Sequence, residues 1–340
     1  MNEGPEFKII GDANDEEKRK ARKDLLNSLF NHFESLPPNY QEMVAKLEYP
    51  KSEKEIRSID FANSETNRLL QKLGLSFYDI PYSNYHIIPP DLYKEITGSE
   101  GTAVTYCYQQ GILFNAQTHR DNSFYFAILA FHETLHLKSF FSEEANIDDD
   151  GDIRITPYRE GISIRARQKE GLHGKYHDHF LGLNEAIVTM QQKLIHRKLI
   201  NLPFFKEERV WLDSPRAIEL KVKAAVDYDV SIDDIIWIEE KENGDYDYKT
   251  FPYSGQRFVL EYICEEIQKQ FPDQYHSFDE IFDEFLKSIF TGGLITVGRL
   301  VEKTFGSGSF RLLGMIDESD TSAYSVLEAL KKARNRKLKN

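Results

Sequence analysis

The chain has 340 residues, 40% of them hydrophobic and 29% charged, which is enough apolar material for a sizeable core in about two domains. The formal net charge of −13 repels phosphate backbones and argues against general binding to nucleic acid. The basic stretch at residues 331–339 is expected to be a solvated helix end, where cations suit the helix dipole.

Neither a secretory leader nor a membrane span is expected from the sequence. Residues 1–12 lack a basic start followed by an apolar stretch, and the longest strongly apolar run, at 124–131, has only eight residues. Two cysteines are too few for a disulfide framework. These features predict a cytoplasmic protein with no membrane partner.

The front half of the chain is expected to mix helices and strands. Polar, helix-forming stretches stop at prolines or glycine, and β-branched and aromatic residues alternate around short turns. These patterns predict helices at 16–33 and 52–73, a strand at 85–88, a hairpin of 102–108 with 112–115, a buried helix at 124–141, and a second hairpin that turns near Glu160 and Gly161.

The back half is expected to be mainly helical, interrupted by a polar insert at residues 241–245. Helical periodicity predicts helices at 180–200, 254–270, 278–290 and 294–305. Strands in the front half and helices in the back half together predict an α+β fold class.

The buried helix carries the sequence His132-Glu133-Thr134-Leu135-His136. Residues four apart lie on one face of a helix, so both imidazoles can reach one metal ion. Zinc suits neutral imidazoles, and Glu133 stands beside them as a base for a water molecule. Two histidines and a glutamate on a buried helix are costly unless a ligand satisfies them, so we expect a metal bound by His132 and His136.

A tetrahedral zinc site needs a third protein ligand and leaves the fourth position to water. The best candidate is Glu185, near the start of a long helix after Gly182, from which it could point back across a cleft. Glu143 and Glu144 are expected to continue the helix beyond His136, too far along its axis to meet the same ion.

Other ligands remain open. His173, His177 and His179 lie shortly before the candidate glutamate and are expected to be surface histidines of a polar loop, with a share in a metal site as the alternative. Cys107 could serve as a ligand beside the two helical histidines, as in a peptide deformylase, although its neighbours lack that family's motif.

An HExxH followed by a helix that begins with an Asn-Glu pair resembles the gluzincin branch of zinc metallopeptidases, to which thermolysin belongs. His132 and His136 match that family's histidine ligands, Glu133 its general base and Glu185 its glutamate ligand. Thr189 departs from the family pattern, because thermolysin-like enzymes carry there an aspartate that hydrogen-bonds a ligand histidine. A threonine hydroxyl would orient that histidine more weakly. The match covers about residues 100–190.

The resemblance implies a zincin-like fold of two subdomains, with a mixed sheet, an active-site helix and a mainly helical C-terminal subdomain. It predicts an upper subdomain over 81–145 that ends in the HExxH helix. Residues 1–80 lie outside the match, and their polar, helical pattern predicts an N-terminal helical extension. Residues 146–340 would form the C-terminal subdomain that carries the third ligand. An edge strand of the hairpin, either 112–115 or the strand before it, would align an extended substrate.

The resemblance also implies a histidine or tyrosine that stabilises the oxyanion of a tetrahedral intermediate. By residue type the candidates are Tyr248, Tyr253, Tyr262, His196 and His276. His196 lies about three helical turns beyond Glu185 and is expected to be too distant.

The expected function is hydrolysis of peptide bonds in a peptide or protein substrate, with Zn²⁺ as the cofactor and Glu133 as the general base. Two histidines and a carboxylate can also hold iron or manganese, so the choice of zinc rests on the resemblance. The alternative is a catalytically silent or latent protein on the same scaffold, a metal-stabilised binding or regulatory module. A segment of residues 1–80 lying in the cleft would favour that alternative.

Overall fold

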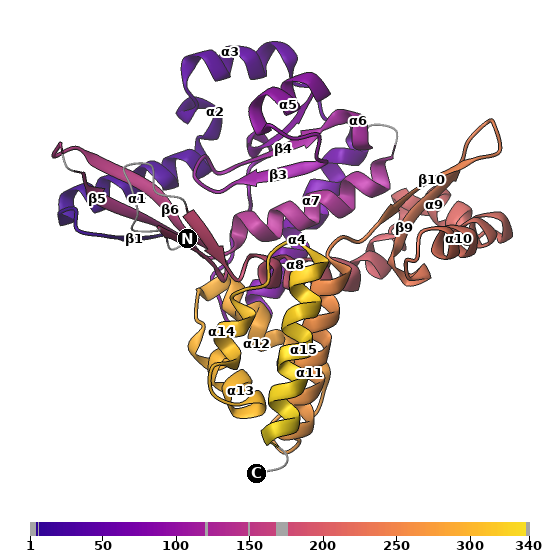
Figure 1. Ribbon diagram of the computed structural model, residues 1–340. Coiled ribbons are helices and arrows are strands. Elements are labelled where there is room, and N and C mark those ends of the chain that lie inside the picture. Colours follow the sequence, from indigo (N-terminus) through magenta and orange to yellow (C-terminus); the bar gives the residue numbers. More distant parts are fainter. Residues whose placement is uncertain (1–4, 6, 120–121, 149, 168–175, 338–340) are drawn as a thin grey trace.

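The computed structural model describes residue 5 and residues 7–119, 122–148, 150–167 and 176–337. The fold is α+β, as predicted: two mixed sheets belong to the N-terminal half, and a mainly helical part follows (Figure 1). In Figure 1 the C-terminal helices stand together below the sheets, and α7 crosses the centre. None of the helices in these described ranges combines the length and the apolar character needed to cross a membrane.

The smaller mixed sheet has the order β2-β4-β3. Strand β2 (Tyr85–Ile88) runs parallel to β4 (Gly111–Asn115), and β3 (Ala103–Tyr106) runs antiparallel to it. The predicted hairpin is therefore confirmed. Its edge strand is β3, so the alternative that residues 112–115 form the edge is wrong, because β2 pairs with their other side.

The larger mixed sheet begins with a parallel pair and continues as an antiparallel meander. The order of this sheet is β1 (Lys8–Ile10), β5 (Phe141–Ile147), β6 (Ile153–Glu160), β7 (Ser163–Arg167) and β8 (Tyr176–His179). The predicted second hairpin is confirmed, and it joins β6 to β7.

Glu143 and Glu144 lie on β5, so their expected place on the active-site helix is wrong. Helix α7 (Ser123–Lys138) ends where Ser139 adopts extended backbone angles. The next amide, of Phe140, then donates a hydrogen bond to the carbonyl of Ile289, 2.9 Å away. This contact, distant in sequence, turns the chain into the strand.

Helix α7 carries apolar residues all round its circumference, and its residues from Phe124 to Lys138 are buried together with the polar side chains of its second half. The amide of Tyr125 donates to the side chain of the N-cap residue Asn122, 2.8 Å away. A helix that is hydrophobic all round must be enclosed by other elements. It packs against α4 (Glu53–Lys72) and α8 (Leu181–Leu199).

Helix α4 begins with a capping box between Ser52 and Glu55 and shares the main hydrophobic core with α7. The Lys138 ammonium, itself buried, ties the two helices together by donating to Thr66 Oγ1 at 2.8 Å and Asn67 Oδ1 at 2.7 Å. Burial lowers the pKa of Lys138 to about 7. Residues 1–80 thus contribute a helix to the centre of the molecule.

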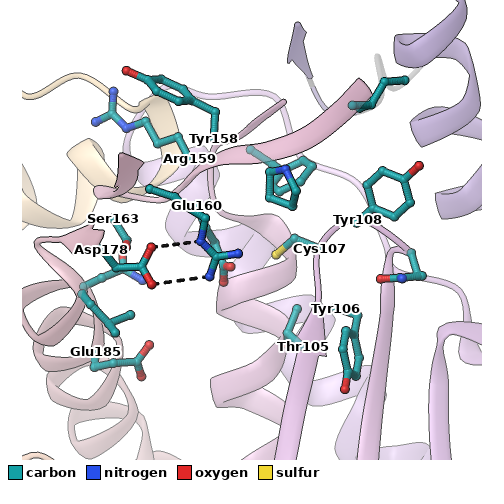
Figure 2. Close-up of a pocket in the computed structure, with 17 residues that line it drawn as sticks. Thr105, Tyr106, Cys107, Tyr108, Tyr158, Arg159, Glu160, Ser163, Asp178 and Glu185 are labelled. Carbon is teal, nitrogen blue, oxygen red and sulfur yellow. Dashed lines mark hydrogen bonds and ion pairs between the residues drawn. The ribbon is translucent and has the colours of Figure 1, made fainter. Parts of the chain in front are cut away.

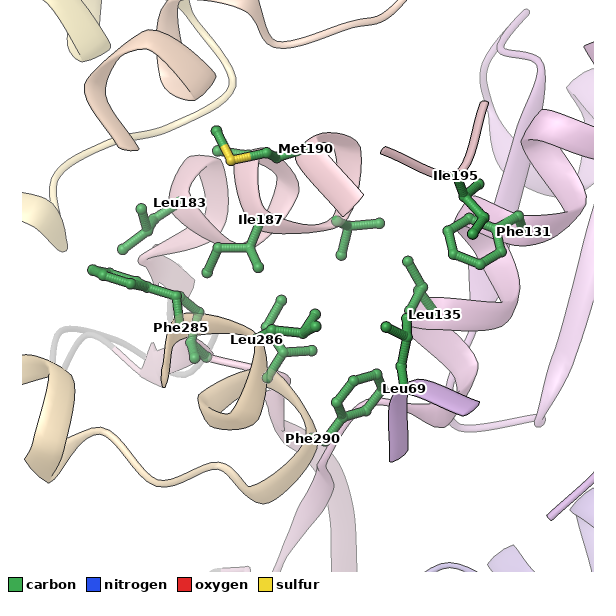
Figure 3. Close-up of a cluster of buried hydrophobic side chains, with 14 of the residues drawn as sticks. Leu69, Phe131, Leu135, Leu183, Ile187, Met190, Ile195, Phe285, Leu286 and Phe290 are labelled. Atoms are coloured by element: carbon green, nitrogen blue, oxygen red, sulfur yellow. The ribbon is translucent and has the colours of Figure 1, made fainter. Parts of the chain in front are cut away.

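The core around α7 and α8 receives side chains from four helices. The side chains that pack against one another there are leucine, isoleucine, phenylalanine and methionine, all of them apolar (Figure 3). The members labelled in Figure 3 are Leu69 of α4, Phe131 and Leu135 of α7, Leu183, Ile187, Met190 and Ile195 of α8, and Phe285, Leu286 and Phe290 of α12 (Phe278–Thr291).

The predicted C-terminal helices are confirmed, and one further long helix follows them. The buried Arg334 near the end of that last helix donates to Glu266 Oε2 at 3.0 Å, so part of the basic stretch is a packed helix end. Besides α12, these helices are α11 (Ser254–Gln270), α13 (Ile295–Phe305), α14 (Ser309–Leu313) and α15 (Asp320–Lys337).

The polar insert at 241–245 is the tip of an antiparallel hairpin that the sequence patterns did not predict. It joins β9 (Ile235–Glu240) to β10 (Tyr246–Thr250), which pack on α10 (Pro215–Asp227) in a small separate core. The remaining helices are α1 (Asp15–Phe30), α2 (His32–Ser35), α3 (Pro38–Leu47), α5 (Pro90–Thr97), α6 (Ala116–His119) and α9 (Lys206–Leu212).

The position of α4 leads to a stability prediction. Ile59→Ala should lower the free energy of unfolding by about 2–5 kcal/mol, because Ile59 is fully buried against the main core. Ile56 on the same helix is 37% exposed, so Ile56→Ala should change it by less than about 0.5 kcal/mol. Urea unfolding followed by circular dichroism measures both, and equal losses would contradict the placement of α4 in the core.

Candidate metal centre

The side chains of the HExxH segment are buried on the face of α7 that meets α8 and the small sheet. His132, Glu133 and His136 are 8%, 7% and 6% exposed. The two Nε2 atoms lie 3.2 Å apart, as expected for residues four apart on one helix face. Both imidazoles therefore point at a common position.

Glu185 reaches that position from the first turns of α8. Its Oε2 lies 3.5 Å from His132 Nε2 and 3.4 Å from His136 Nε2. The start of α8 is held by the amide of Gly182, which donates to Ile316 O at 2.9 Å. A Cβ at Gly182 would lie 2.1 Å from the backbone oxygen of Asp317, so this close approach requires glycine.

The three side chains form a buried group that could hold a metal ion, with their ligand atoms all within 4.8 Å of one another. Ligands bound at about 2.0–2.1 Å with tetrahedral angles lie roughly 3.4 Å apart. The observed separations of 3.2, 3.4 and 3.5 Å match that spacing. Two imidazole nitrogens and one carboxylate oxygen are also a donor set that suits zinc, so the residues fit such an ion.

The charges within the group reinforce one another. Burial disfavours the ionised form of Glu185, but the two imidazoles outweigh it and lower the pKa of this carboxyl. Burial likewise disfavours the imidazolium of His136, but Glu185 and Glu160 outweigh it and raise the pKa of His136 well above its usual value. A cation at this position would take over the role of the imidazolium proton.

Two side chains that sequence reasoning missed orient the outer nitrogens of the imidazoles. Nδ1 of His132 lies 3.4 Å from Oε1 of Gln192, and Nδ1 of His136 lies 3.4 Å from Oε1 of Glu160. The contact with Gln192 fixes the tautomer that leaves Nε2 of His132 free for a metal, whereas Glu160 meets His136 as an ion-pair partner without a hydrogen bond. Thr189 does not supply this contact, because its buried hydroxyl has no hydrogen-bond partner among the residues that the structure describes.

Glu133 points to the edge strand of the small sheet. The hydroxyl of Thr105 on β3 donates to Glu133 Oε2 at 2.7 Å and contacts the Glu133 carbonyl at 3.1 Å. One carboxylate oxygen is thus held by the sheet. No strong sequence signal marks Thr105, since it lies 28 residues away and meets Glu133 only through the packing of β3 on α7.

A cavity of about 550 Å³, called here the metal-site cavity, opens beside the group. Figure 2 shows Glu185 on one side of it and Thr105 and Cys107 on the other. The hairpin of β6 and β7 supplies a further wall, which includes Glu160 and Ser163. None of its lining side chains comes from the described part of residues 1–80.

The other predicted ligands lie outside the group. Cys107 lines the metal-site cavity, but burial first and Glu160 second raise the pKa of its thiol well above the usual value, which disfavours a thiolate ligand. His177 and His179 lie on β8 with their rings 4.7 Å apart, and neither belongs to the metal-ligand group. His173 falls outside the described residues.

Of the five candidates for an oxyanion-stabilising residue, Tyr253 lies in the electrostatic field of the site. Burial raises the pKa of its hydroxyl, and the charges of Glu185 and Glu133 raise it further. His196 packs between Phe124 and Phe251. Tyr248 packs on Tyr228, Tyr262 lies beside Phe305, and the amide of His276 donates to Glu280.

No known protein family, curated protein or solved structure shows significant similarity to this chain.

The raised pKa of His136 predicts how metal affinity depends on pH. Without a metal ion, this imidazole holds its proton at neutral pH because Glu185 and Glu160 stabilise the charge. A bound metal must displace the proton, so affinity for zinc should fall roughly tenfold per pH unit on acidification for each proton displaced. Competition with a chromophoric chelator at pH 6, 7 and 8 measures this, and an affinity that does not change with pH would contradict it.

The contact of Gln192 with His132 predicts a loss of metal affinity when the amide is removed. Gln192→Leu should weaken zinc binding roughly 10- to 100-fold, because Nδ1 of His132 loses the partner that orients the ring. Thr189→Val on the same helix is the matched control and should leave the affinity unchanged, since the Thr189 hydroxyl makes no hydrogen bond within the described part of the chain. Equal affinities for the two variants would refute the orienting role.

Proposed function

We propose that the protein is a zinc-dependent peptidase of the gluzincin type with a zincin-like two-subdomain fold. The observation that carries the proposal is the convergence of His132, His136 and Glu185 at tetrahedral-site spacing, with Glu133 beside them. The edge strand β3 along the same helix supports it, because an edge strand can pair with an extended peptide.

Zinc in such a site supplies Lewis acidity toward a water molecule and toward the carbonyl of the bond to be cleaved. Glu133 would take the proton from the attacking water and pass it to the leaving amine. Thr105 would hold one carboxylate oxygen of Glu133 in place, so that the other is free to carry the proton. Backbone groups of β3 would align the peptide across the metal-site cavity.

Of the five candidates, Tyr253 would be the one to stabilise the developing oxyanion, because the charges of Glu185 and Glu133 act on its hydroxyl. Its hydroxyl donates to Glu318 at 3.3 Å, a long hydrogen bond that a substrate oxyanion could replace. Its backbone has a φ of +58° at the start of α11, a strained conformation for a non-glycine residue. Strain of this kind is frequent where a side chain must be aimed at a functional site.

The alternative, a metal-stabilised binding or regulatory module, predicts a closed site. The metal-site cavity has none of the described residues of 1–80 on its wall, which favours an accessible site. A hydroxamate inhibitor distinguishes the two functions. It should bind an enzyme with an exchangeable fourth position and should fail to bind a closed structural site.

The proposal predicts about one zinc per chain in the wild type and clear loss of zinc in Glu185→Ala, because two imidazoles alone leave the ion under-coordinated. Plasma mass spectrometry on both proteins, purified side by side without chelator, measures this. Absence of metal from the wild type after zinc is supplied would exclude a zinc enzyme. Full retention by Glu185→Ala would exclude Glu185 as the ligand.

Glu133→Gln provides the matched test of catalysis. This variant should keep its zinc, because Glu133 is not a ligand, and should lose hydrolysis of a susceptible peptide, because the amide cannot accept the proton. The measurement requires a preparation free of contaminating protease. Unchanged hydrolysis would exclude Glu133 as the base and attribute the activity to another site.

A further inference from the structure

A second cavity, of about 640 Å³, lies on the other side of the end of β3 from the metal centre; we call it the tyrosine cavity. It is enclosed by α1, α2 and α3, by the small sheet and by β5 and β6. Tyr106, Tyr108, Gln109 and Ile155 line both cavities and form the wall between them.

One segment serves both cavities because β3 ends at Tyr106 and the turn that follows it carries Cys107 and Tyr108 between them. Figure 2 shows Cys107 turned toward the side of Glu185, whereas Tyr106 and Tyr108 extend away from it. A molecule in the tyrosine cavity would therefore contact the strand that holds Glu133 through Thr105.

The tyrosine cavity contains a buried carboxylate that lacks a partner. Glu143 of β5 is 1% exposed and lines the cavity, and its Oε1 makes no hydrogen bond to any described residue. In the described part of the chain no lysine, arginine or histidine nitrogen lies within 4 Å of it or of Asp24, the second carboxylate of the wall. Burial raises the pKa of Glu143 to about 7, and the charge of Asp24 contributes.

The two histidines of the wall are already paired. His32 donates from Nδ1 to Gln109 O at 2.8 Å, and its Nε2 lies 2.8 Å from Nε2 of His86. Burial, then the proximity of His86, lowers the pKa of His32 to about 4, so His32 is neutral. His86 is paired in turn with Glu48 at 3.0 Å. The histidines thus place no uncompensated positive charge in the cavity.

Aromatic and aliphatic side chains share the wall with Glu143. Tyr40 of α3 joins Tyr106 and Tyr108, and Leu36, Val44 and Leu113 complete the apolar wall. Tyrosine faces attract cations, most strongly where water is excluded. A buried carboxylate without a counter-ion, in a wall that also carries aromatic rings, is an arrangement that suits an ammonium or guanidinium group carried on an apolar stem.

We propose that the tyrosine cavity binds an organic cation, an ammonium or guanidinium group on an apolar or aromatic stem, with Glu143 as its counter-ion. A cationic group of this kind could come from two sources. One is the lysine or arginine side chain of a peptide that also occupies the metal-site cavity, a source that rests on the proposed peptidase function. The other is a free amine, which requires no peptidase activity.

The first test compares phenethylamine with its neutral counterpart 2-phenylethanol by isothermal titration calorimetry on the full wild-type chain. The amine should bind at least tenfold more tightly, because only the cation can pair with Glu143. Equal affinities, or binding of neither compound, would overturn the proposal. This comparison needs no variant and therefore does not depend on how any variant folds.

Matched variants then assign the counter-ion. Glu143→Gln should lose the tenfold preference for the amine, whereas Glu144→Gln, on the next residue of β5 and outside the cavity wall, should retain it. Glu143→Gln removes a buried charge without a partner, so its thermal unfolding temperature should equal or exceed that of the wild type. A folded Glu143→Gln that retains the preference would exclude Glu143.

A peptide library with lysine or norleucine at each position distinguishes the two sources. Preferential cleavage of lysine peptides by the wild type but not by Glu143→Gln identifies a peptide side chain. Binding of the amine with no preference for lysine peptides identifies a free amine. If phenethylamine binds but no peptide is cleaved, the peptidase proposal fails alone. If peptides are cleaved but amine and alcohol bind equally, the cavity proposal fails alone.

Discussion

Two imidazoles and a carboxylate are buried together between α7 and α8, and the cost of removing them from water governs what surrounds them. None of the three could stay buried alone, because an isolated charge or an unpaired polar group is expensive in an apolar interior. Gln192, Glu160 and Thr105 complete the set of partners. The apolar surface of α7 encloses the group, and the surrounding helices hold its geometry.

Sequence reasoning was most successful for candidate site residues that lie on the same helix. The spacing of His132 and His136 is enough to place both rings on one face, because residues four apart on an α-helix always lie on the same face. Glu185 required the resemblance to a known family, since spacing alone does not show that α8 faces α7. The C-terminal helices followed from periodicity and their caps, which are local properties.

The failures occurred where contacts between distant segments decide the structure. Residues 139–147 contain no proline or glycine to stop a helix, and only pairing with β1 and β6 makes them a strand. Glu160 ends a strand and is 37% exposed at its side chain, so nothing local marks it as a partner of His136. The tyrosine cavity is likewise built by segments from both ends of the front half.

The contact of Gly182 with the segment around Ile316 has a consequence for synthesis. A growing polypeptide emerges from its N-terminus, so the HExxH helix is complete long before residues 314–317 have been made. Phe180 and Gly182 donate to the carbonyls of Gly314 and Ile316, so the first turn of α8 reaches its final backbone contacts only after these residues have been made. The position of Glu185 in the folded protein therefore depends on a segment that leaves the ribosome long after α7 and α8 themselves.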